Sequence, residues 1–227
     1  MNDSKNEVCA VSDVSGATVI RQNGTAESVA AIGQYSAECR RISAEFHRKL
    51  QVLSKLARLT RGRLREWFQS KINALPHEIV WADSFPNLIT TQGVNYLLDN
   101  GLAGSAFTAA NYMGLISSAS YSAIVAADTA ASHAGWLEAG AANAPAYSGT
   151  VRPTCVWSAA SARNKALSSS LSFTMSTPGT VKGSFISTSS VKDGTAGVLF
   201  SAGLFSGGDR AVIANDVITV AYNVTIN

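Results

Sequence analysis

The residues best suited to catalysis are the histidines, and one of them lies close to a serine and an aspartate. His133 directly follows Ser132 and comes shortly after Asp128, so one short segment holds the residue types of a Ser–His–Asp triad. A chain this rich in serine offers such a set by chance. It contains neither a Gly-x-Ser-x-Gly nucleophile motif nor a glycine-rich phosphate loop. His47 and His77 lie far away in the sequence. We therefore predict a protein that is not an enzyme and has no catalytic residues.

Cysteine and carboxylate spacing gives no sign of a metal or cofactor. Cys9, Cys39 and Cys155 are too scattered for a zinc site or a disulfide framework, so we predict three free thiols in a chain made in a reducing cytoplasm. A carbohydrate-cleaving or carbohydrate-binding module is an alternative that would need paired carboxylates or aromatic platforms. The candidates for these roles are Glu78, Asp83, Asp99, Asp128, Glu138, Asp193, Asp209 and Asp216, with Trp81, Trp136 and Trp157.

A strongly basic segment is the clearest sign of a partner. Residues 40–71 hold ten Lys or Arg and two Glu, a net charge of +8, whereas the whole chain of 227 residues carries +3. Clustered cations contact phosphates, and Trp67 and Phe68 offer stacking surfaces, so nucleic acid is one candidate partner. We favour docking onto an acidic protein surface or into a helical bundle, and a merely solvated face is the third interpretation. The predicted anchor residues are Ile42, Phe46, Leu50, Leu53, Leu56, Arg58, Arg61, Arg65 and Trp67.

The sequence pattern changes at Pro76, so the elements expected to position these residues differ before and after it. Residues 1–35 lack a persistent period and are predicted to form an extended or disordered arm. Residues 36–75 carry apolar residues at steps of three, four or eight, which predicts a basic amphipathic helical anchor. Ser36 is its expected cap, Gly62 its expected interruption, and Pro76 forbids its continuation.

Beyond Pro76 the pattern becomes that of a β-domain. Short runs rich in Val, Ile, Phe and Tyr are separated by turn residues, and the last run alternates strictly. The fold class is therefore mainly β: a jelly-roll-like β-sandwich over about 78–227, preceded by the arm and the helical segment. A short helix is expected over 92–99. The expected strands are 78–82, 86–90, 111–117, 150–157, 168–176, 180–188, 197–205 and 216–226.

The β-domain is poor in charge. Residues 72–227 carry eight acidic and six basic side chains, about 9% of their number, against roughly 25% in ordinary soluble domains. Such a surface suits faces that are covered by copies of the chain or by other subunits, and a merely neutral surface is the alternative interpretation. We predict no membrane association, because the charge-free run from Asn100 to Ala127 is broken by Asn111, serines and glycines and no signal peptide is recognised.

A series of short motifs resembles a β-domain of virion structural proteins from tailed bacteriophages. The resemblance spans about 83–226 and covers nothing before residue 76. Its motifs are Asp83–Thr90, Gly93–Asp99, Tyr112–Ile116, Asp128–Trp136, Arg152-Pro153, Asn164–Ala166, Ser172–Thr174, Gly197–Ala202 and Leu204-Phe205.

The resemblance implies a virion part of the head-decoration, tail or tail-fibre type. We expect a non-enzymatic structural protein, tail-associated or a fibre or collar component, anchored by its N-terminal helical region and located in the virion after synthesis in the host cytoplasm. A capsid head-decoration protein and a nucleic-acid-binding protein using residues 40–71 are the alternatives. The expected partners are copies of itself, most simply as a homotrimer, and a portal or tail-adaptor protein or the major capsid protein; no cofactor is expected.

Overall fold

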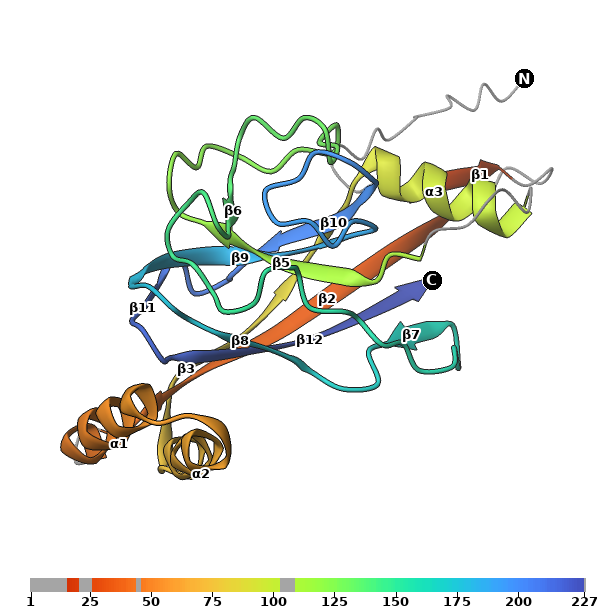
Figure 1. The fold of residues 1–227 in the computed structure, drawn as a ribbon. Coiled ribbons are helices and arrows are strands. Elements are labelled where there is room, and N and C mark those ends of the chain that lie inside the picture. Colours follow the sequence, from red (N-terminus) through yellow and green to blue (C-terminus); the bar gives the residue numbers. More distant parts are fainter. Residues whose placement is uncertain (1–15, 21–25, 44–45, 103–108, 227) are drawn as a thin grey trace, which may run out of the picture.

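The chain folds mainly as β-structure, with two antiparallel sheets, a helical hairpin and one further helix (Figure 1). The computed structural model describes residues 16–20, 26–43, 46–102 and 109–226. The two sheets form the body of the molecule, and the hairpin projects from one end of it. The expected mainly-β class is confirmed.

The first sheet is built around the long strand β2 (Ala26–Ile42). β2 pairs antiparallel with β12 (Val217–Ile226) along one edge and with β3 (His77–Pro86) along the other. Three shorter strands complete this sheet: β1 (Gly16–Ile20) on β2, and β7 (Asn164–Ala166) and β8 (Leu171–Thr174) on β12.

The second sheet has β9 (Gly179–Ser187) near its centre. β9 lies between β5 (Tyr112–Ser117) and β10 (Leu199–Leu204), and all its pairings are antiparallel. The remaining strands are short: β4 (Leu88–Ile89), β6 (Glu138–Ala139) and β11 (Arg210–Val212).

The two sheets share one apolar core. Tyr35 of β2 contributes to this core from the first sheet, where its ring lies between Phe85 of β3 and Tyr222 of β12 at centroid distances of 5.3 and 4.6 Å. Its hydroxyl lies 2.9 Å from the Ser201 hydroxyl on β10, so a completely buried tyrosine of the first sheet bonds to the second. Both sheets contribute fully buried side chains to this core, including Phe173, Ile218, Met113, Leu115 and Ile186.

Within the described ranges three helices accompany the sheets: α1 (His47–Leu59), α2 (Gly62–Asn73) and α3 (Thr91–Leu102). The expected helix over 92–99 is confirmed in α3, which packs on β10 so closely that a Cβ at Gly93 would lie 2.2 Å from the carbonyl oxygen of Phe200. Thr90 caps α3 by accepting the N–H of Gly93 at 3.0 Å. The helix is interrupted at Thr60 and Arg61, which are both extended, and Gly62 begins α2 with a φ of +57°, so the expected interruption is confirmed.

The expected helix over 36–75 is wrong in its first part. Residues 36–42 belong to β2, so Ser36 caps no helix, and part of the expected arm forms β1 and the start of β2. The side chains of Tyr35, Ala37 and Cys39 are buried and alternate with exposed ones. Pairing on both edges therefore decides the conformation here, since β2 pairs with β12 as far as Arg40 and with β3 as far as Ile42. Residues 1–15 and 21–25 of the expected arm lie outside the described residues.

The strand expected over 150–157 is also wrong. This segment makes only isolated bridges, such as Thr154 with Tyr112 and Trp157 with Leu167. Pro153 has no N–H to give to a ladder, and the side chain of Arg152 turns inward to a buried carboxylate. The expected strands in the second half of the chain are otherwise found, at β8, β9, β10 and β12.

The two buried thiols give a test of this core. Burial raises the pKa of Cys39 and of Cys155 to about 12, and the Asp216 carboxylate adds to the effect at Cys39. Because the thiolate is the reactive form, iodoacetamide at pH 8 should leave both residues unmodified in the native protein and alkylate both in urea. Peptide mapping by mass spectrometry distinguishes the sites. Rapid labelling of either residue under native conditions would contradict this packing.

Candidate functional site

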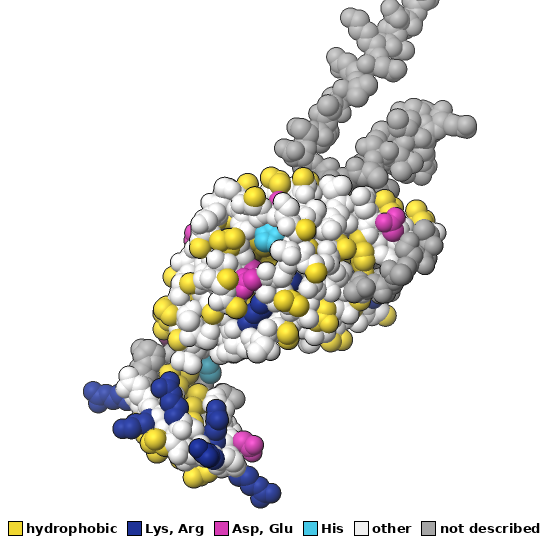
Figure 2. All heavy atoms as spheres, turned by 45° about the horizontal axis from the view of Figure 1, so that its top comes forward, with side chains coloured by type: hydrophobic (Ala, Val, Ile, Leu, Met, Phe, Trp, Pro, Cys, Tyr) yellow, Lys and Arg dark blue, Asp and Glu magenta, His cyan; other side chains and the backbone are white. Residues whose placement is uncertain are grey.

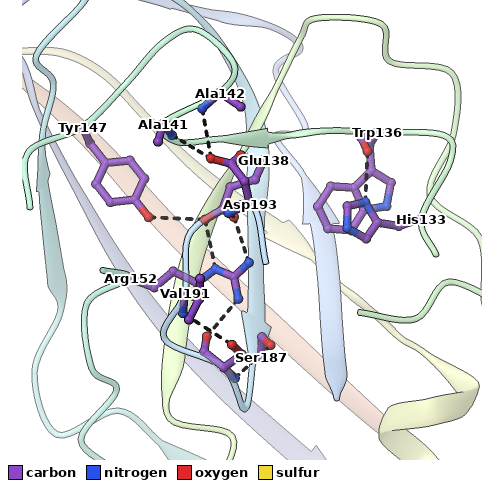
Figure 3. Close-up of polar contacts among 11 residues, drawn as sticks. His133, Trp136, Glu138, Ala141, Ala142, Tyr147, Arg152, Ser187, Val191 and Asp193 are labelled. Atoms are coloured by element: carbon purple, nitrogen blue, oxygen red, sulfur yellow. Dashed lines mark hydrogen bonds and ion pairs between the residues drawn. The ribbon is translucent and has the colours of Figure 1, made fainter. Parts of the chain in front are cut away.

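The loop around His133 does not form the triad that its residue types suggested. The His133 Nδ1 atom lies 3.0 Å from the Trp136 carbonyl oxygen, and the two rings stack at 4.1 Å (Figure 3). Asp128 instead accepts the indole N–H of Trp136 at 2.9 Å and the Val125 N–H at 3.0 Å. The carboxylate thus fixes a buried tryptophan and the turn before it, which is a structural role.

A buried ion pair lies nearby, between Glu138 on β6 and Arg152 (Figure 3). The guanidinium donates to both carboxylate oxygens, from Nε at 3.0 Å and from Nη2 at 2.8 Å. The same carboxylate accepts the backbone N–H of Asp193 at 2.6 Å, and Arg152 donates to the Ser189 carbonyl at 2.8 Å. The carboxylate and the guanidinium are therefore bound to each other and to backbone groups of residues 189 and 193, and the cluster holds loops together.

Three more of the carboxylates proposed as candidates for chemistry are likewise bound. Asp83 pairs with Arg210, Asp209 with Lys182, and Asp193 accepts the N–H groups of Ala141 and Ala142. Burial alone would raise the pKa of Asp83, but hydrogen bonds from Ser206, Gly207 and Arg210 hold it below its ordinary value. No group of three or more His, Cys, Asp and Glu in the described ranges is placed to hold a metal ion. Trp136, one of the proposed aromatic platforms, is buried.

The hairpin formed by α1 and α2 is the feature that stands apart from this packed body (Figure 1). Its two ends leave from the adjacent strands β2 and β3, and the Ser43 N–H donates to the Pro76 carbonyl at 3.1 Å to close the base. Arg41, at the end of β2, donates to the buried Asp216 carboxylate at 2.8 and 2.7 Å. The hairpin therefore emerges from a fixed base.

The two helices cover only part of their apolar surface with each other. Leu50, Leu53 and Ala57 of α1, and Phe68 and Ile72 of α2, are buried or half-buried. Other large apolar side chains of the hairpin remain open to solvent: Val52 is 59% exposed, Leu56 37%, Leu59 73%, Leu64 53% and Trp67 52%. Burying such a side chain is worth roughly 1.5–3 kcal/mol, so this surface favours a partner.

The hairpin is also where the positive charge gathers (Figure 2). Residues 47–73 carry eight Lys or Arg and one Glu, a net charge of +7, and all nine are exposed. Trp67 lies edge-on to Phe68 at 5.0 Å with the Lys71 ammonium 5.4 Å from its ring centre. Arg40 and Arg41 of the expected basic helix belong to β2, where they pair with Glu38 and Asp216.

The structure brings most of the nine predicted anchor residues together on the hairpin. Leu50, Leu53, Leu56, Arg58, Arg61, Arg65 and Trp67 lie on it or in its turn, and Phe46 directly precedes α1.

Ile42 does not belong to the hairpin, because it is buried at the end of β2, and Leu50 and Leu53 lie on the hairpin but are half-buried rather than exposed to a partner. Sequence reasoning missed Val52, Leu59 and the exposed side of Leu64, although the 52, 56, 59 spacing carried the signal of a second apolar face.

No helix in the part of the chain that the structure describes is long and apolar enough to cross a membrane. No protein-family model, no curated protein and no solved structure matches this chain.

The Glu138–Arg152 pair gives a test of the structural role assigned to this cluster. Arg152→Ala leaves a buried carboxylate without its cation, so we expect the free energy of unfolding to fall by about 3–5 kcal/mol. Arg40→Ala removes the exposed pair with Glu38 and should change it by less than about 1 kcal/mol. Urea unfolding followed by tryptophan fluorescence measures both. Equal effects of the two substitutions would contradict the role of the buried pair.

Proposed function

We propose that this chain is a non-enzymatic structural protein of a bacteriophage virion, tail-associated or a fibre or collar component. The hairpin of α1 and α2 is its anchor, and the two-sheet body, a jelly-roll-like β-sandwich, is the part that the assembly presents. The observation that carries the proposal is the hairpin itself, which leaves the body from a fixed base with apolar and basic side chains exposed together.

The character of the body supports a structural role. Its buried carboxylates are engaged with cations or backbone N–H groups, as Glu138, Asp128 and Asp216 are. Its low charge suits a surface that neighbouring subunits cover, because desolvating few charges costs little. We place the homotrimer contact, in this proposal, on the body, since hairpins of equal charge repel one another. The motifs that resemble those of phage virion proteins lie in the same body.

Two alternatives use other parts of the chain. A head-decoration protein would grip the capsid with its sheets, and the hairpin would then be dispensable for attachment. A nucleic-acid-binding protein would use the exposed arginines of the hairpin, such as Arg58, Arg61 and Arg65. The exposed aliphatic side chains favour the protein anchor, because phosphate contacts need no Leu or Val.

Replacing the hairpin tests the proposal. In a variant with residues 44–75 replaced by Asn-Gly, Ser43 and Pro76 flank a two-residue turn that suits two antiparallel strands. We expect a folded body with nearly the wild-type melting temperature that no longer enters particles in phage-producing cells. Circular dichroism and quantitation of the chain in purified particles measure these outcomes. Incorporation at the normal copy number would contradict the anchor and favour attachment through the sheets.

A further inference from the structure

Helix α1 has two apolar faces, and only one of them is used within the chain. With about 100° per residue, Leu50, Leu53 and Ala57 lie on one side, and these are the buried or half-buried positions. Val52, Leu56 and Leu59 follow at i, i+4 and i+7 and lie on a second side, centred about 125° around the helix from the first. We call these three residues the outer stripe. Val52 is 59% and Leu59 73% exposed, and Leu56, at 37%, is partly covered, so a large part of the outer stripe remains open to solvent.

The spacing of the outer stripe is that of a helix–helix seam. Steps of four and three are the d–a–d steps of a heptad, in which apolar side chains of one helix insert between those of another. The stripe is also narrow: on the same helical geometry its residues fall within about 60° of one another. A helix that lies in a bilayer interface presents a broader apolar face, so the geometry favours a partner helix over a lipid surface.

Basic residues border the outer stripe on both sides. Arg48 and Lys55 lie along one border and Lys49 along the other, and all three are exposed. In a seam of this kind the flanking positions choose the partner through charge. A partner helix that fits must carry acidic residues beside its own apolar stripe. A second copy of the hairpin would instead place two segments of net charge +7 against each other, and these would repel.

We propose that the outer stripe of α1 docks an acidic amphipathic helix of another protein, which becomes a third helix against the hairpin. The inference rests on the proposed function and adds the face and the chemistry of the partner to it. Val52, Leu56 and Leu59 supply the apolar contact, and Arg48, Lys49 and Lys55 select the acidic partner. Leu64 and Trp67, near the tip on α2, extend the exposed apolar surface beyond the stripe.

The test measures binding of the full chain to two synthetic helical peptides. Both carry leucine at the seam positions; one has glutamate and the other has lysine at the flanking positions. We expect the glutamate peptide to bind and the lysine peptide not to bind. Val52→Ser, Leu56→Ser and Leu59→Ser should each weaken binding by about tenfold. Val156→Ser is the matched control, because Val156 on the body is 58% exposed and Val52 is 59% exposed.

Charge reversal distinguishes charge complementarity from nonspecific apolar binding. Lys49→Glu combined with Lys55→Glu should weaken binding of the glutamate peptide and create binding of the lysine peptide. Equal binding of both peptides, or binding that the three serine substitutions leave unchanged, would overturn the inference. So would tighter binding to anionic phosphatidylglycerol vesicles or duplex DNA than to the glutamate peptide, or self-association abolished by the same substitutions.

These outcomes are distinguishable from failure of the proposed function. If the hairpin replacement blocks incorporation into particles while the outer-stripe substitutions do not affect peptide binding, the anchor stands and the docking face is elsewhere on the hairpin. If incorporation survives loss of the hairpin although the peptide binds as expected, the docking face is real and the anchor is not.

Discussion

The ion pair between Arg41 and the buried carboxylate of Asp216 is the interaction on which the placement of the hairpin depends. This carboxylate accepts two hydrogen bonds from the Arg41 guanidinium and a third, at 3.0 Å, from the N–H of Ile213. Arg41 is the second-last residue of β2, just before the chain enters the hairpin, and Asp216 directly precedes β12. A buried carboxylate is stable only while its charge and lone pairs are satisfied, so this pair fixes the end of β2 against the start of β12. The hairpin thereby departs in a defined direction from the body.

A second ion pair, between Glu138 and Arg152, fixes the irregular segment between β5 and β7. Between β5 and β7 the chain runs through residues 118–163 with β6 as the one strand there that the structure describes. Glu138 and Arg152 join distant points of this segment to each other, and through Asp193 and Ser189 to the chain that follows β9. Irregular backbone of this length needs such fixed points, since it has few ladder hydrogen bonds of its own. The two pairs together give a rigid body and a rigid base, from which an exposed hairpin can reach a partner.

The parts of the fold that could be predicted from sequence are those where side-chain pattern and environment agree. β12 alternates strictly, and α3 has apolar residues at helical spacing, so both were found near their true bounds. β2 was missed because the residues at its buried positions include Gly33, Ala37 and Cys39, which are too small to give a strong apolar alternation. Its strand conformation comes from pairing with β12 and β3, and that information lies elsewhere in the chain.

The same distinction applies to the candidate site. The basic helical segment was visible as a run of charge with apolar steps, because neither feature needs tertiary context, but its folding into a hairpin was not predicted. The buried roles of Glu138, Asp128 and Asp216 were not visible, since an isolated carboxylate in a sequence shows no partner. Ile42 was assigned to the anchor face for the same reason, and only the strand pairing reveals that it belongs to the body.

Hydrogen–deuterium exchange of the free protein and of the assembled particle tests the central claim most directly. The claim is that the hairpin, and α1 in particular, is the surface that the assembly covers. It predicts that amides of α1 and α2 exchange at least about tenfold more slowly in the particle, because a docked helix opens less often. Hairpin amides that exchange equally fast in both states, together with new protection confined to the sheets of the body, would contradict it.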